Sequence, residues 1–140
     1  PFNIDAKTCT KWAKQGPKTA KERLISGKAL NWLSDDLGSS ICWAIEAWLL
    51  NNKPLRENHG GGFPEMWEYF LKNAPKDLVS KTTHCHSNCF WLDNKLLGHK
   101  DYDIDPLPIN EWKLKAQECF EETETIISLL LGEDQLPKAP

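Results

Sequence analysis

The sequence contains no long hydrophobic run. Its uninterrupted apolar stretches are only a few residues long, whereas a membrane-spanning helix needs roughly 20. The opening segment, PFNIDAKTCTKW, also lacks the apolar centre of a secretory signal. We therefore expect no membrane contact and no secretory leader within the chain.

Internal repeats, low-complexity tracts and period-two runs of β-branched residues are also missing. Nothing therefore indicates a repeat protein, and strand signals are absent. Cysteine occurs five times, and these residues are scattered along the chain. An odd, scattered set disfavours a disulfide framework and predicts a reduced, cytoplasmic protein.

The residues that are present are typical of one folded domain. Hydrophobic residues make up 40% and charged residues 26% of the chain, and a disordered chain would have fewer apolar residues. A chain of 140 residues can bury one core without covalent cross-links. We expect residues 1–132 to form a single helical domain and residues 133–140 to form a flexible tail.

Apolar residues recur at spacings of three and four almost throughout, which predicts helices. The expected helices are Asp5–Ser26, Ala29–Leu50, Pro64–Lys72, Asp77–Leu97, and a last helix from a capping Asn110 to Leu131. Gly16-Pro17 is expected to kink the first helix or to divide it in two, because proline removes a backbone donor. Gly27, Gly98 and Gly132 are expected helix ends. The predicted fold class is all-α, an up-and-down bundle of four to five helices.

The net charge of −3 conceals an uneven distribution. Seven basic residues and one acid lie between Lys7 and Lys28, which gives +6, whereas residues 101–140 carry ten acids and three lysines, which gives −7. At 100° per residue, five lysines fall within an arc of roughly 80° on the first helix. This lysine stripe, with Arg23 beside it, is a candidate phosphate-binding or nucleic-acid-binding surface; its lysines are Lys7, Lys11, Lys14, Lys18 and Lys21. Docking on an acidic partner and a simple solvated face are the alternatives.

Four residues of zinc-ligand type lie close together: His84, Cys85, His86 and Cys89. On a helix, consecutive side chains point about 100° apart, so the four cannot converge on one ion. Cys85 and Cys89 also fit a buried stripe, where cysteine acts as a small apolar residue. We therefore predict no metal and no cofactor, and a half-site of His86 and Cys89 completed by a second chain stays open.

The glycine-rich loop Asn58-His59-Gly60-Gly61-Gly62 precedes a helix. Glycines let backbone amides approach an anion, so a phosphate could bind there. The loop lacks the Walker spacing and its Lys-Ser/Thr end. A flexible connector is the favoured interpretation.

The segment from Asp93 to Tyr102 brings amides, charges, a histidine and a tyrosine to the end of one helix. His99 is a candidate general acid or base, because free histidine titrates near working pH. RNA cleavage through its own 2′-hydroxyl needs no metal if a cation stabilises the phosphorane. Lys95, Lys100 or Arg23 could supply that cation. A histidine that merely follows a helix end is the alternative.

Several segments together resemble the HEPN superfamily, small helical domains of prokaryotic toxin–antitoxin and defence systems. They are KWAKQGPKTAKERLISGK, SSICWAIEAWLL with Glu46, NKLLGHKDYDIDPLP and ECFEETETIISLL. The resemblance extends over about Lys11 to Leu131. It implies a helical bundle that works as a homodimer and binds a nucleotide, RNA or a partner protein such as a nucleotidyltransferase.

Catalytic HEPN members are ribonucleases with an arginine, four to six residues, a histidine and a tyrosine shortly after it. The resemblance places the histidine on His99, the tyrosine on Tyr102 and the arginine on Asn94. Asparagine cannot supply the positive charge that stabilises a phosphorane. Lys95 is adjacent but points about 100° away.

Three hypotheses follow. The first is a non-catalytic binding module, in a toxin–antitoxin or defence context. The second is a metal-independent endoribonuclease that uses His99, with Lys95 or another cation. The third is an interaction scaffold. Trp32, Trp43 and Trp91 lie off the main apolar stripes, which favours a dimer interface.

Overall fold

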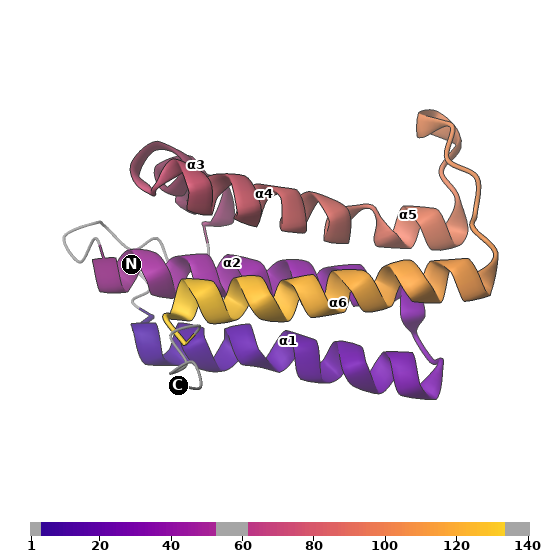
Figure 1. Ribbon diagram of the computed structural model, residues 1–140, viewed down its shortest axis with the longest axis horizontal. Helices are drawn as coiled ribbons and strands as arrows, with labels where there is room; N and C mark the ends of the chain where they lie inside the picture. The colour runs from indigo at the N-terminus through magenta and orange to yellow at the C-terminus, as the bar shows by residue number, and fades with distance from the viewer. Residues whose placement is uncertain (1–3, 53–61, 134–140) are drawn as a thin grey trace, which may run out of the picture.

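The computed structural model describes residues 4–52 and 62–133, and nearly all of this part of the chain is helical. The elements are α1 (Ala6–Ser26), η1 (Leu30–Trp32), α2 (Leu33–Asn52), α3 (Phe63–Asn73), α4 (Lys76–Phe90), α5 (Leu92–Leu97), η2 (Lys100–Tyr102) and α6 (Ile109–Leu131). The only β-type pairing within the described ranges is an isolated bridge between His99 and Ile104. The predicted all-helical, up-and-down bundle is confirmed (Figure 1).

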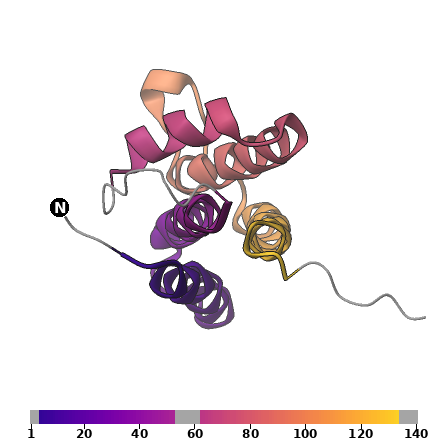
Figure 2. The ribbon, with the colours of Figure 1, turned by 90° about the vertical axis from the view of Figure 1, so that its left-hand side faces the viewer.

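The helices form three layers. α1 lies on one side, α2 and α6 lie in the middle, and α3, α4 and α5 lie on the other side (Figures 1 and 2). α2 contacts α1, α3, α4, α5 and α6. This central position follows from its sequence, because α2 carries buried residues around most of its circumference.

The core is built mainly from α2 and from the faces of α4 and α6 that pack on it. Its largest fully buried side chains include Trp112, Phe70, Leu33, Leu37, Ile41, Ile45, Leu49 and Leu92. Trp112 also has a polar role, because its Nε1 donates to the Leu92 carbonyl at 2.7 Å. Such a bond satisfies the indole N–H inside the core and ties α6 to α5.

α1 is one continuous helix, so the predicted division at Gly16-Pro17 is wrong. The Asp5 carboxylate caps its start by accepting from the Thr8 N–H at 2.8 Å, and Gly27 ends it at φ 71°. Pro17 is buried, and Gly16 lies directly against the Asp36 carbonyl and Ser40 of α2. Packing against α2 thus offsets the backbone hydrogen bond that proline removes.

The predicted helix Asp77–Leu97 is broken at Trp91 into α4 and α5. In a continuous helix the Cys89 carbonyl would accept from the N–H four residues later. Here the Trp91 N–H and the hydroxyl of Ser34 on α2 both donate to that carbonyl. The backbone N–H of Asn94 donates to the Asp93 carboxylate at 2.9 Å. These contacts mark the junction between α4 and α5.

Other observed helix boundaries differ from the predicted ones by a few residues. The 3₁₀ turn η1 precedes α2, and Phe63 belongs to α3. Asn110 is not a cap, because α6 begins at Ile109 with Pro108 before it. Gly98 and Gly132 do end helices, with φ of 78° and 74°.

The first residue of the predicted tail contacts the bundle. Glu133 belongs to the folded body: its N–H donates to the Ser128 carbonyl at 2.8 Å and its carboxylate pairs with Lys14 at 2.9 Å. Residues 134–140, and the glycine-rich loop except for Gly62, lie outside the described residues. Among the helices that are described, none has the length and apolarity needed to cross a bilayer.

Alanine substitutions at two glycines inside helices, Gly16 and Gly38, test the contact between α1 and α2. A Cβ at Gly16 would overlap the Asp36 carbonyl, whereas a Cβ at Gly38 would meet only His86 Nε2, at 3.7 Å. Gly16→Ala should lower the free energy of unfolding by about 1–3 kcal/mol. Gly38→Ala should raise it by up to about 1 kcal/mol, through helix propensity. Urea unfolding followed by circular dichroism measures both, and equal stabilisation by both would contradict the close contact.

Candidate functional site

A cavity of about 630 Å³ lies between α2, α3, α4 and α5, with the η2 loop at its edge. Its walls mix aromatic rings with polar side chains. The lining residues used below are Asp35, Cys42, Trp67, His86, Trp91, Asp93, Asn94, His99 and Tyr102. A volume of this size is typical of small-molecule sites.

Three of the four predicted catalytic residues meet in this cavity. Asn94, His99 and Tyr102 all line it. The ring centroids of His99 and Tyr102 are 4.7 Å apart. The segment singled out from the sequence is therefore a real cluster in space, carried by α5 and the loop that follows it.

His99 is held by its backbone. Its N–H donates to the Ile104 carbonyl at 2.8 Å, and its carbonyl accepts from the Ile104 N–H at 3.0 Å. Gly98 is needed before it, since its φ is 78° and a Cβ there would lie 2.9 Å from Pro106 Cδ. The His99 Nδ1 atom is buried and has no hydrogen-bond partner among the described residues.

Lys95, the fourth predicted catalytic residue, is not part of this cluster. It does not line the cavity, and its positive charge lies near the Cys119 thiol of α6, whose pKa it helps to lower. The Lys95 carbonyl accepts from the Leu107 N–H at 2.8 Å, which fixes this side of α5 toward the start of α6. Lys95 is therefore not among the described residues that line the cavity with His99.

The described lining of the cavity contains no lysine or arginine. Its formally charged side chains at neutral pH are the carboxylates of Asp35 and Asp93. Carboxylates accept hydrogen bonds from N–H donors and repel phosphate. The cavity therefore suits a neutral or donor-rich group better than an anion.

Aromatic rings form much of the wall. The Trp91 ring lies 5.3 Å from Phe90 and 5.3 Å from Tyr102, in edge-to-face geometry. Trp67 of α3 lies 4.8 Å from the His86 ring. Planar ligands bind such walls by stacking or edge contacts.

A second cluster in the cavity was not predicted from the sequence. Trp67 Nε1 donates to Cys42 Sγ at 3.4 Å, and His86 Nε2 lies 4.0 Å from the same sulfur. Burial raises the pKa of the Cys42 thiol to about 11 and lowers the pKa of His86. Both groups are neutral near pH 7, so this thiol is not an activated nucleophile.

Only one sequence signal bears on this cluster. His86 was noted as a possible metal ligand, but the side chains of that segment diverge. His86 faces the cavity, Cys85 and Cys89 contact Thr123 in the core, and His84 contacts Asn88 at the surface. No metal-binding group of three or more His, Cys, Asp or Glu occurs in the described ranges. The predicted burial of Cys85 and Cys89 is confirmed.

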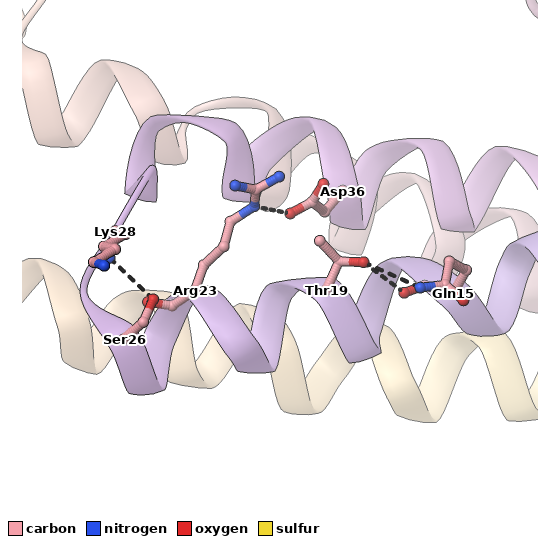
Figure 3. Close-up of polar contacts among 6 residues, drawn as sticks. All are labelled: Gln15, Thr19, Arg23, Ser26, Lys28 and Asp36. Atoms are coloured by element: carbon pink, nitrogen blue, oxygen red, sulfur yellow. Dashed lines mark hydrogen bonds and ion pairs between the residues drawn. The ribbon is translucent and has the colours of Figure 1, made fainter.

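The lysine stripe is exposed on α1 and does not meet the cavity, since no α1 residue lines it. Lys14 pairs with Glu133. Arg23, also a candidate for phosphate binding, reaches across to α2, where its Nε lies 2.6 Å from Asp36 Oδ2 (Figure 3). Both side chains of this pair are mostly buried, so Arg23 serves the contact between helices.

Comparisons of the chain with known protein families, with curated proteins and with solved structures found no match. The resemblance to the HEPN superfamily therefore stays a prediction from the sequence.

The lowered pKa of His86 predicts a pH dependence of stability. Because folding favours the neutral imidazole, the unfolded chain binds the proton more readily once the pH falls below the ordinary value of 6.5. The free energy of unfolding should therefore fall as the pH drops through 6.5, and level off below the folded pKa. His86→Asn should flatten this change, whereas His84→Asn, on the exposed face of the same helix, should not. Equal slopes for both variants in urea titrations would contradict the burial of His86.

Proposed function

We propose that this chain is a non-catalytic, HEPN-like binding module whose cavity holds the base of a nucleotide or of single-stranded RNA. The observation that carries the proposal is the meeting of Asn94, His99 and Tyr102 with the aromatic wall of Trp67 and Trp91 in one cavity. Proteins that bind single-stranded nucleic acid stack bases on aromatic side chains and read their edges with polar groups.

The polar groups suit a base. The carboxylates of Asp35 and Asp93 and the amide oxygen of Asn94 can accept from exocyclic amino groups and ring N–H groups. The buried Nδ1 of His99 can donate or accept, depending on its tautomer. Since the described lining holds no lysine or arginine, the phosphates of such a ligand would lie outside the cavity.

The carboxylates of Asp35 and Asp93 disfavour RNA cleavage in this cavity. Cleavage of RNA through its 2′-hydroxyl needs a base for the proton and a positive charge for the phosphorane. His99 offers the first, but Asn94 stands where the resemblance implies an arginine, and the charge of Lys95 lies beside Cys119. The endoribonuclease hypothesis is therefore the second candidate, and His99 is the observation that favours it.

The proposed module works as a homodimer or with a partner such as a nucleotidyltransferase, in the cytoplasm. Of the three tryptophans predicted at an interface, Trp43 packs within the chain between Trp12 and Phe63, at 4.6 and 5.1 Å. Trp91 also packs within the chain. Trp32 is 54% exposed and is the one that suits an interface. All five cysteines are described, and none of them is in a disulfide.

Binding of adenosine monophosphate and of a short fluorescent single-stranded RNA tests the proposal. Trp91→Leu should weaken both affinities about tenfold or more, because stacking contributes about 1–3 kcal/mol per base. Leu114→Ala is the control, since Leu114 is exposed on α6 and lies outside the cavity. Calorimetry measures the affinity for adenosine monophosphate, and fluorescence anisotropy measures the affinity for the RNA. Equal affinities for the two variants, or no binding by the wild-type protein, would exclude a base-binding cavity.

An RNA cleavage assay in EDTA separates the two candidate functions. We expect no cleavage by either the wild-type protein or His99→Ala, because the cavity supplies no positive charge. Cleavage by the wild type that is lost in His99→Ala would instead establish a metal-independent ribonuclease. Asn94 would then be a tolerated variant of the motif.

A further inference from the structure

Three thiols gather behind the cavity, between α4 and α6. Cys85 Sγ lies 3.6 Å and Cys89 Sγ 3.2 Å from the same atom, Thr123 Oγ1. Cys119 stands four residues before Thr123 on α6, and residues four apart share one face of a helix. Helix periodicity therefore brings two thiols of α4 and one of α6 to one place.

α4 and α6 run antiparallel (Figure 1). Cys119, one turn before Thr123, therefore lies beside Cys89, one turn after Cys85. The neighbouring thiol raises the pKa of Cys89 and lowers the pKa of Cys119, and the amino group of Lys95 also lowers the latter. Cys119 is therefore the thiol that loses its proton more readily. Cys119 is also the more accessible, at 8% exposure against 0%.

We propose that Cys119 and Cys89 are a peroxide-sensitive dithiol that closes to a disulfide between α4 and α6. The Cys119 thiolate attacks one oxygen of hydrogen peroxide; the O–O bond breaks, hydroxide leaves and takes up a proton to form water, and Cys119 becomes a sulfenic acid. The Cys89 sulfur then attacks the Cys119 sulfur; the S–O bond breaks, and the hydroxyl leaves as a second water with the proton of Cys89. Two thiols are oxidised and one peroxide is reduced.

The other cysteines are less suited to this chemistry. Cys42 lies beside Trp67 and His86, and burial raises its pKa to about 11. Cys9 belongs to a separate cluster with Ile4 and Ala47. Cys85 is on the same helix as Cys89, one turn away, and is fully buried. Thiolate character and access select the oxidised thiol.

Peptide mapping after peroxide treatment tests the proposal. The wild-type protein is treated with hydrogen peroxide, its remaining thiols are blocked under denaturing conditions, and it is digested with trypsin. Two of the five thiols should be lost. Peptide 82–95 should be joined to peptide 116–138, with a mass two hydrogens below their sum, and dithiothreitol should separate them.

Peptide 82–95 contains both Cys85 and Cys89, so the pair needs assignment. Cys85→Ala should retain the link and Cys89→Ala should abolish it; fragmentation of the linked wild-type peptides gives the same assignment if a variant fails to fold. A link through Cys85, a link found only between two chains, or unchanged titration of all five thiols would overturn the proposal. Oxidation of Cys119 to the sulfinic acid without a link would also overturn it.

Discussion

The hydrogen bond from the Ser34 hydroxyl to the Cys89 carbonyl is the contact on which the candidate site depends. It joins α2 to the end of α4, at the place where the helix is interrupted and α5 begins after Trp91. Trp112 Nε1 donates to the Leu92 carbonyl from α6. A net contribution of about 0.5–1.5 kcal/mol is ordinary for one such bond. Together the two bonds hold the junction of α4 and α5 against α2 and α6, beside the cavity that Ser34 and Asn94 line.

Charge is distributed so that the acidic cavity and the lysine stripe are separate. The cavity carries Asp35 and Asp93, whereas the lysine stripe lies on α1, from which no described residue lines the cavity. Arg23 pairs with Asp36 between the two helices. A ligand with a donor-rich base and an external phosphate fits this distribution, and an anion inside the cavity does not. The cation that the catalytic hypothesis needs is not among the described residues that line the cavity with His99.

Much of the fold could be predicted because the spacing of apolar residues and the glycines at helix ends are local signals. The break at Trp91 could not, and it lies where Ser34, 55 residues earlier in the chain than Cys89, contacts the Cys89 carbonyl. Continuity through Pro17 likewise depends on packing against α2. Within the site, the sequence indicated His99 and Tyr102, and the 100° step indicated that Lys95 points elsewhere. The sequence singled out His86 but not its meeting with Cys42 and Trp67, because these residues come from three different helices.

The central claim is that the cavity, and not the lysine stripe, recognises the ligand. Titration of adenosine monophosphate into isotope-labelled protein, followed by amide and indole N–H resonances, tests this claim most directly. The account predicts that shifts concentrate on the Trp67 and Trp91 indoles and on the backbone of Asn94 and His99. Shifts confined to the exposed face of α1, or no shifts at saturating ligand, would contradict it.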